Sequence, residues 1–141
     1  MSQIKKVSCH VVSAPVAKPF TSSRGWIYKT RGSCIVEIET TDGIVGWGEC
    51  YGPSAVAKAF IDTQFGPRII GRDPFDIEVI WEDLYNRIKD YGTTGMAISA
   101  ISGIDIALWD IVGKSYWNAN ENIGFLYRNG EITYFEPKQA F

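Results

Sequence analysis

The stretch SCIVEIETTDGIVGWGEC, residues 33–50, contains two β-rich runs joined at Asp42-Gly43. Aspartate and glycine accept the positive φ angles of a tight turn, so this stretch predicts a β-hairpin. Upstream, residues 4–12 alternate well enough to predict a third strand. The three strands would form an antiparallel meander, which is too small to be stable unless other elements pack on one face.

The segment before the hairpin divides into a strand and an irregular part. The strand over residues 4–12 has two faces, of which we assign Lys5, Val7, Cys9 and Val11 to the core and Ile4, Lys6, Ser8 and His10 to the opposite side. Residues 13–32 mix two prolines, four basic residues and three aromatic residues without a helical or strand period. We therefore expect a long loop there.

Helical patterns follow the hairpin. Residues 53–65 begin with a proline, which suits a first helical turn. In residues 73–90, Asp73 is the expected N-cap and Pro74 the first helical residue. The apolar face of this second helix consists of Ile77, Ile80, Trp81, Leu84, Tyr85 and Ile88. The charged residues between them are interpreted as a solvated face, and are Glu78, Glu82, Asp83 and Arg87.

The segment SAISGIDIALWDIVGK, residues 99–114, lies within a third predicted helix over residues 94–112. Its apolar stripe consists of Ala97, Ile101, Ile104, Leu108 and Ile111. Ala100, Gly103 and Ala107 keep one flank small, so that another backbone can approach and offset the cost of about 1 kcal/mol for a mid-helix glycine. The expected fold class is α+β, a three-stranded antiparallel meander followed by a helical bundle.

Asp105 and Asp110 stand inside this third helix and raise the question of a metal site. Their spacing places them about 140° apart around the helix axis, so they cannot share one ion. Asp110 precedes Lys114 by one helical turn, which predicts an intrahelical ion pair. Asp105 lies beside the apolar stripe and is expected to be partly buried, with a backbone or basic partner. Both are interpreted as architectural.

Composition limits the classes of function. The 141 residues carry 14 basic and 16 acidic side chains, and a net charge of -2 favours neither nucleic acid nor a membrane as partner. No segment predicts a cleaved leader or a membrane span. Cys9, Cys34 and Cys50 lie in apolar runs, as expected of buried free thiols in a cytoplasmic protein. Without a CxxC, and with His10 as the single histidine, no metal site is predicted.

Three motifs together resemble a known family. They are DGIVGWGEC (42–50), GRDPFDIEVIWEDLY (71–85) and AISGIDIALWDIVGK (100–114). In this order they resemble the mandelate racemase and muconate lactonizing branch of the enolase superfamily. The last motif is similar to the signature of that branch at Ala100, Ser102, Gly103, Asp105, Ala107, Asp110, Gly113 and Lys114. The resemblance implies that residues 1–114 are an N-terminal capping domain, of the acid-sugar dehydratase or lactone cycloisomerase type.

Residues 115–141 differ from the family pattern and form a divergent tail. Asn129-Gly130 lies between two strand-like runs and predicts a hairpin, with Tyr127 opposite Ile132. The family's catalytic β/α barrel would need about 200 residues or more, so we expect it to be absent from this chain.

The resemblance also implies the chemistry of a full-length enzyme. In such enzymes a lysine or histidine of the barrel removes the proton beside a substrate carboxylate, and Mg²⁺ stabilises the enediolate. We predict no catalytic residue and no metal ligand in this chain, which alone should be inactive. Mg²⁺ is expected as the cofactor of the full-length enzyme.

The resemblance further implies two cap segments that close over the barrel and select the substrate. By position they are residues 18–32 and 49–53. The candidate substrate-binding residues are Arg24, Trp26, Phe20 and Tyr51. An arginine, here Arg24 or Arg31, can bind a carboxylate or polyol oxygens, and aromatic rings can exclude water. The predicted substrate is a small carboxylate such as a sugar acid or its lactone.

Other interpretations stay open. The aromatic residues can simply anchor a surface loop. A non-catalytic α+β module that binds a ligand through this loop, or that oligomerises, also fits the pattern. Apolar helix faces that a barrel would cover rarely stay exposed in monomers, so we expect a homo-oligomer.

Overall fold

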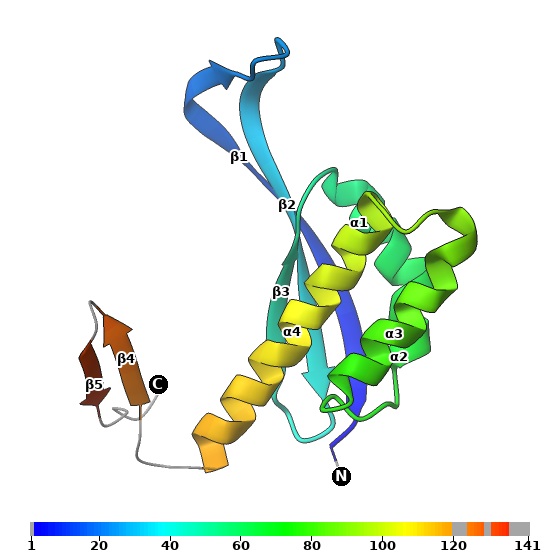
Figure 1. Cartoon of the computed structure of the whole chain (residues 1–141), viewed down its shortest axis with the longest axis vertical. Coiled ribbons are helices and arrows are strands. Elements are labelled where there is room, and N and C mark those ends of the chain that lie inside the picture. The colour runs from blue at the N-terminus through cyan, green and yellow to red at the C-terminus, as the bar shows by residue number, and fades with distance from the viewer. Residues whose placement is uncertain (1, 120–123, 129–130, 136–141) are drawn as a thin grey trace.

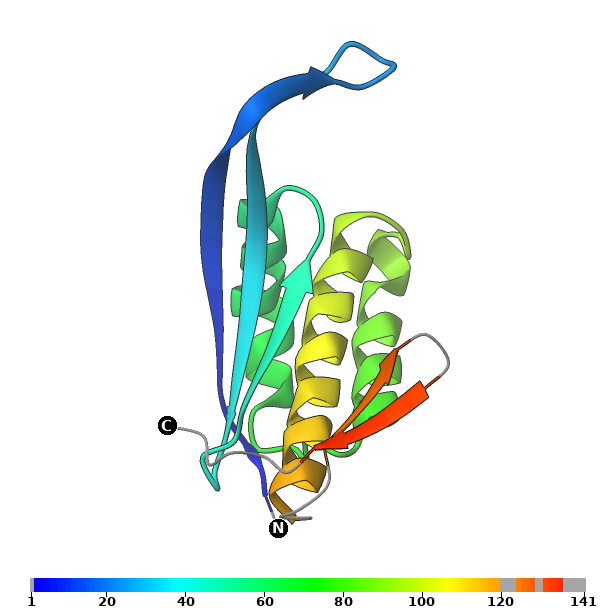
Figure 2. The same cartoon turned by 90° about the vertical axis from the view of Figure 1, so that its left-hand side faces the viewer.

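The computed structural model describes residues 2–119, 124–128 and 131–135. β1 (Ile4–Thr21), β2 (Ile27–Thr40) and β3 (Val45–Cys50) form an antiparallel sheet in the order β1-β2-β3. Helices α1 (Ser54–Phe60), α2 (Gly66–Ile69), α3 (Ile77–Ile88) and α4 (Met96–Ala119) gather on one face of this sheet (Figures 1 and 2). The predicted α+β fold, a meander followed by helices, is confirmed.

The core lies between the sheet and α4. Cys34, Val36 and Ile38 alternate inward along β2, as the hairpin pattern predicts. The whole apolar stripe predicted for α4 is buried, namely Ala97, Ile101, Ile104, Leu108 and Ile111. Cys9, Cys34 and Cys50 are free and buried, which confirms the prediction of buried free thiols. Burial raises the pKa of the Cys9 and Cys50 thiols to about 12, so both stay protonated at neutral pH.

Glycines bring α4 into backbone contact with β3. A Cβ atom on Gly48 would clash with the carbonyl oxygen of Gly103 and lie 2.9 Å from the amide nitrogen of Ala107. A Cβ atom on Gly46 would likewise clash with the Ala107 carbonyl. The small residues predicted on one flank of α4 therefore let the helix backbone contact the β3 backbone, without intervening side chains.

The prediction of a long loop over residues 13–32 is wrong. β1 and β2 continue their ladder beyond the helical layer, pairing Ser13 with Gly32 and Pro15 with Thr30, and only residues 22–26 connect them. This ribbon projects past the helices (Figure 1). Most of its residues are exposed, so the alternation that marks a half-buried strand is missing. Pro15 is tolerated because β1 is an edge strand.

A bulge corrects the face assignment at the start of β1. The register shifts between Ile4 and Lys6, so that Lys5 has no Cα partner on β2. One extra residue turns the preceding side chain to the other face. Ile4 is therefore buried, against prediction, while Cys9 faces inward as expected. His10 is exposed on the outer face, where its Nε2 lies 2.6 Å from Oε2 of Glu37.

Two helix starts differ from prediction. Asp73 is not an N-cap: it accepts a hydrogen bond from the amide of Phe75 at 2.9 Å, and α3 begins at Ile77. An aspartate can close a local turn of this kind instead of capping a helix. The third helix begins at Met96 rather than Thr94, after Gly95 with φ of 79°.

The helix from Ser54 and the face of α3 agree with prediction in outline. The helix that begins at Ser54 continues from α1 through a π-helical segment, η1 (Ile61–Phe65), into α2. On α3, Ile77, Ile80, Leu84 and Ile88 are buried. Trp81 and Tyr85 stack on one another at the edge of this face, with ring centroids 5.0 Å apart. A short 3₁₀ segment, η2 (Lys89–Tyr91), follows α3.

Two features concern the end of the chain. α4 passes through the boundary predicted at residue 114 and ends at Ala119. β4 (Gly124–Arg128) and β5 (Glu131–Phe135) pair antiparallel with Tyr127 opposite Ile132, which confirms the register of the hairpin. Its Asn129-Gly130 turn lies outside the described residues.

One segment of α4, Met96–Tyr116, is long and apolar enough to cross a membrane by length and composition, contrary to the sequence-based expectation. Its apolar stripe packs against the sheet and α3, and a buried core helix has the same composition.

Candidate functional site

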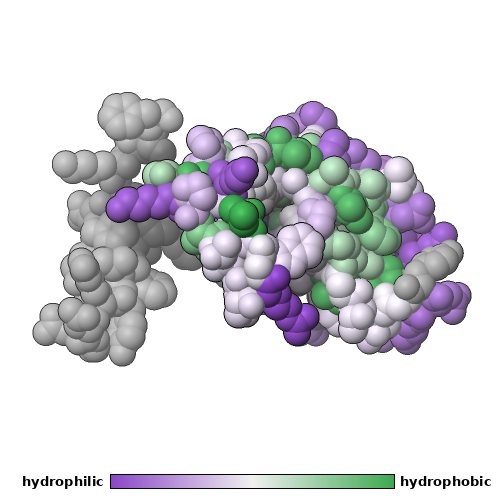
Figure 3. All heavy atoms as spheres, turned by 90° about the horizontal axis from the view of Figure 1, so that it is seen from above, coloured by the Kyte–Doolittle hydropathy of each residue, from purple (hydrophilic) through white to green (hydrophobic). Residues whose placement is uncertain are grey.

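A concavity of ≈ 640 Å³ lies where the β1–β2 ribbon meets the turn after β3. It brings together the two predicted cap segments, which are far apart in the sequence. Trp26 and Tyr28 come from the first segment and Tyr51 from the second. From the ribbon end, the surface of the molecule mixes hydrophilic and hydrophobic side chains (Figure 3). The lining itself combines charged residues such as Arg31 and Glu49 with aromatic rings, which suits a ligand with both polar groups and a carbon skeleton.

Arg31 is the cationic group of this concavity. Its Cζ atom lies 5.3 Å from the ring centroid of Phe20 and 5.3 Å from that of Tyr28. These two rings stack on each other at 5.0 Å because Phe20 and Tyr28 are paired across the ribbon. A guanidinium over aromatic faces is held in orientation and keeps its hydrogen-bond donors available. Phe20, a predicted site residue, thus supports Arg31 and does not itself line the concavity.

Arg24 lies in the connection at the tip of the ribbon, outside the lining of the concavity. The tip is closed by a hydrogen bond from the amide of Ser22 to the carbonyl of Trp26 at 2.9 Å. Gly25 takes a φ of 80° there. Of the four predicted residues, the structure therefore brings Trp26 and Tyr51 to one cavity, with Phe20 behind it and Arg24 apart.

Glu49 and Ser33 also line the concavity, and neither is among the four residues predicted from the sequence. Ser33 Oγ donates a hydrogen bond to Oε1 of Glu49 at 2.6 Å, and Oε2 has no hydrogen-bond donor among the described residues. Their pattern contained a signal, because Glu49 follows Gly48 on a strand whose alternate residues point outward. A carboxylate acceptor near a guanidinium donor can hold neighbouring oxygens of one polyhydroxy acid.

The turn that carries Tyr51 is attached to the start of α4. Ser99 Oγ donates a hydrogen bond to the carbonyl of Tyr51. Gly52 has a φ of 103°, a conformation that favours glycine. The side chain of Tyr51 is 81% exposed, so this residue forms an open wall of the concavity rather than part of the core.

Asp110 of α4 is architectural, as predicted. Its Oδ2 accepts a hydrogen bond from Lys114 Nζ at 2.6 Å and another from the amide of Trp47 at 2.8 Å. Lys114 Nζ also donates to the carbonyl of Val45 at 2.8 Å. The predicted ion pair is therefore confirmed. Both of its side chains also form hydrogen bonds with the backbone of β3.

Asp105 differs from expectation, because no hydrogen-bond partner is found for it in the part of the chain that the structure describes. It is half-buried, and burial raises the pKa of its carboxyl group. Within residues 2–119, 124–128 and 131–135, no three side chains of the metal-binding types converge. These residues do not form a Mg²⁺ site, so no chemical step through a metal is assigned to them.

Comparisons with known proteins follow the same part of the chain. The family described as "Mandelate racemase / muconate lactonizing enzyme, N-terminal domain" matches residues 6–119. D-galactarolactone cycloisomerase of Agrobacterium fabrum is 44% identical over 114 residues, which cover 81% of this chain and 30% of that protein. This chain thus spans about a third or less of the relative's length.

Two solved structures are similar in fold and sequence. The 3,6-anhydro-D-galactonate cycloisomerase from Zobellia galactanivorans has a TM-score of 0.70 at 40% identity, over 86% of this chain and 30% of that one. A racemase from Streptomyces coelicolor A3(2) with bound magnesium has a TM-score of 0.75 at 32% identity, over 80% and 32% of the two chains.

Proposed function

Because this chain belongs to the mandelate racemase / muconate lactonizing enzyme family through its N-terminal domain, we propose that it is the capping and substrate-specificity part of a sugar-acid enzyme. The observation that carries this proposal is the concavity in which Trp26, Arg31 and Tyr51 meet. A relative that is 44% identical over 114 residues is named for a lactone of a sugar acid, which fits this chemistry.

The proposed ligand is a polyhydroxy carboxylate or its lactone. Arg31 donates hydrogen bonds to a carboxylate or to vicinal oxygens, and the free oxygen of Glu49 accepts one from a hydroxyl group. Trp26 and Tyr51 exclude water from the bound carbon skeleton. The part played by this chain is to bind and orient the substrate.

Abstraction of the proton next to the carboxylate is proposed to occur on the remaining two thirds of a full-length enzyme. Mg²⁺ is proposed as the cofactor of that part, in line with the magnesium bound to the racemase relative. The chain by itself is then inactive, and its setting is cytoplasmic.

A chimera tests the capping role. Residues 1–114 of this chain replace the matching segment of D-galactarolactone cycloisomerase, and kcat/KM is measured on galactarolactone and on related sugar acids with Mg²⁺. The variants W26A, R31Q and E49Q in the chimera should each lower kcat/KM by about tenfold or more, a loss typical of removed charged or packed contacts. The control is R24Q, which lies outside the concavity and should change kcat/KM less than threefold.

Two results would refute the capping role. One is a folded, Mg²⁺-binding chimera in which W26A, R31Q and E49Q leave the ratio of rates among substrates unchanged. The other is turnover of a sugar acid by the 141-residue chain alone that a chelator abolishes.

A non-catalytic, self-associating module is the second candidate, and the outer face of α4 favours it. Ile106 and Trp109 are 48% and 57% exposed on this face. Exposed side chains of this size, one turn apart, are typical of a surface that another molecule covers. If this candidate is right, light scattering at tens of micromolar shows a dimer that W109S and I106S convert to monomer. A monomer in the unmodified chain argues against it.

A further inference from the structure

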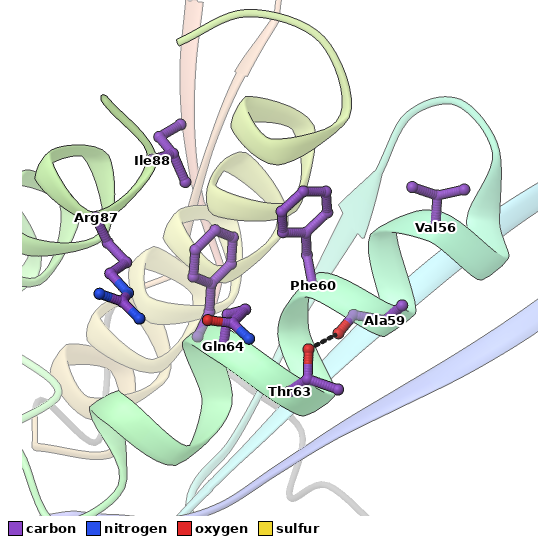
Figure 4. A pocket seen from close by; sticks show the side chains of 8 residues that line it. Val56, Ala59, Phe60, Thr63, Gln64, Arg87 and Ile88 are labelled. Atoms are coloured by element: carbon purple, nitrogen blue, oxygen red, sulfur yellow. Dashed lines mark hydrogen bonds between the residues drawn. The ribbon is translucent and has the colours of Figure 1, made fainter. Parts of the chain in front are cut away.

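A second concavity, of ≈ 430 Å³, lies between the helical run α1–η1 and the C-terminal end of α3. It shares no lining residue with the concavity at the ribbon. Figure 4 shows its side chains: Phe60 and Gln64 come from the first run, and Arg87 and Ile88 from α3. The size falls in the range of about 300–1,000 Å³ that small-molecule sites occupy.

The floor of this concavity is apolar. Phe60 and Phe65 stack with ring centroids 5.7 Å apart, and Phe65 and Ile88 are fully buried. Val56, which is 44% exposed, forms a side wall. These side chains offer a flat hydrophobic surface but no hydrogen-bond partner, so the floor suits an aryl or alkyl group and not a polyol.

The π-helical segment η1 forms one side of the concavity. Segments of this kind are rare and occur frequently at functional sites. Thr63 satisfies its own hydroxyl locally by donating to the carbonyl of Ala59 at 2.6 Å, as Figure 4 shows. Gln64 in contrast has no hydrogen-bond partner within the described residues, and its amide lies at the rim.

Arg87 supplies the charge of the rim. Its natural partner one helical turn earlier, Asp83, already accepts bonds from Nε and Nη2 of Arg68 at 2.7 and 2.6 Å. A third bond to Asp83 comes from Arg72 at 3.0 Å. Among the residues that the structure describes, Arg87 is thus left without an anionic partner, and its guanidinium extends toward Gln64 (Figure 4).

We propose that this concavity binds a small amphipathic monocarboxylate. The carboxylate pairs with Arg87 and accepts a hydrogen bond from the Gln64 amide, while the aryl or alkyl group lies on Phe60, Phe65 and Ile88. Charge complementarity selects an anion, because Arg87 is the one charged residue of the lining and the lining contains no acidic side chain. The apolar floor separates this ligand from the polyhydroxy acid proposed for the ribbon site.

The test uses the 141-residue chain and 3-phenylpropanoate as the probe, followed by ¹H–¹⁵N NMR titration. Amide shifts should move over residues 56–65 and 87–88, with saturation in the millimolar range or below. 3-Phenylpropanamide and acetate should each bind at least about fivefold more weakly, because one lacks the charge and the other the apolar group.

Variants separate the site from general surface binding. R87Q should weaken 3-phenylpropanoate about fivefold, as expected for loss of one exposed charge-assisted contact. Ala59 lines the concavity and Ala55 does not, although both are exposed on α1. A59W should therefore abolish binding by filling the space, while the matched control A55W should leave the titration unchanged.

Several results would overturn the proposal. They are equal binding of the acid and its amide, equal loss in A59W and A55W, and shifts centred on the ribbon concavity. Another is a shift of residues 56–65 with protein concentration and no added acid, which would identify a second copy of the chain as the occupant. A folded R87Q that binds as tightly as the unmodified chain would also refute it.

Discussion

β1 and β2 run through two different environments. Near the helices, β2 alternates buried and half-buried residues from Cys34 to Thr40, and α4 touches β3 backbone to backbone. Beyond them, in the ribbon, the same strands remain paired, with one register shift between Pro15 and Phe20, while Phe20 and Ile27 are 44% and 61% exposed. The first region, here the body, depends on packing. The ribbon depends on pairing, which leaves its side chains free to contact a ligand.

The largest expected effect is at the closest contact of the body. G48A should lower the free energy of unfolding by about 3 kcal/mol, because its methyl group meets the α4 backbone, which cannot rotate away. Urea denaturation measures this. Outside its own helix backbone, no described residue lies within 4 Å of a Cβ atom built on Gly113 of α4, so G113A should instead stabilise by about 0.5–1 kcal/mol. Equal effects of both changes would contradict the contact.

A smaller loss is expected at the attachment of β3 to α4. D110A removes acceptors for Lys114 and for the amide of Trp47, and should cost about 1.5 kcal/mol. Faster hydrogen exchange at Trp47 would locate the effect. The control is D62A, which breaks the exposed pair between Lys58 of α1 and Asp62 of η1 and should cost less than about 0.5 kcal/mol.

A still smaller effect with a defined pH dependence is expected at Asp105. Burial raises the pKa of its carboxyl group in the folded chain. The ionised form therefore destabilises the body once the pH exceeds about 3.9, the pKa of an aspartate in the unfolded chain. D105N should therefore stabilise by about 0.5 kcal/mol at pH 7 and by nothing below pH ~3.5. Thermal unfolding of D105N and of the unmodified chain at neutral and at acid pH checks both expectations.

Asp83 supplies a control of opposite sign. Hydrogen bonds from Arg68 hold the pKa of Asp83 below its usual value. The ionised Asp83 carboxylate stabilises the fold fully above the pKa that it has in the unfolded chain. This stabilisation is lost as the pH falls through its lower pKa in the folded chain. D83N should hence destabilise at pH 7, and its difference from the unmodified chain should shrink in acid.

The smallest effect on stability is expected in the ribbon. F20A removes the stack with Tyr28 but no core contact, so global unfolding should change by less than about 0.5 kcal/mol. Limited proteolysis should nevertheless cut faster between β1 and β2. A cooperative loss of the whole fold in F20A would show that the distinction between ribbon and body is wrong.

Local signals explain what the sequence could predict. The Asp42-Gly43 turn, the apolar stripe of α4 and the pair Asp110–Lys114 each involve near neighbours in the chain, and all three are present. The ribbon leaves no such local signal, because its stability comes from cross-strand pairing, which produces no period in one segment. The bulge at Lys5 is equally invisible in one segment, since a shift of register is a property of two strands.

The site was predictable in part. The two segments that the resemblance predicts as parts of a cap both contribute to one concavity, through Trp26 and Tyr51. Which side chains line it depends on strand orientation, which one segment of sequence does not reveal: Arg24 lies at the tip of the ribbon, whereas Glu49 lines the wall. The absence of an anionic partner for Arg87 among the described residues is not visible in the sequence, because it depends on Arg68 and Arg72 already donating to the Asp83 carboxylate.

The attachment of β3 has one further consequence. β3 lies at the open border of the sheet, where unpaired amides and carbonyls invite a foreign strand to add itself. Asp110 and Lys114 occupy one such amide and one such carbonyl with side chains of α4. The helix thereby covers one amide and one carbonyl of this border, which makes pairing of a further strand at that point less favourable.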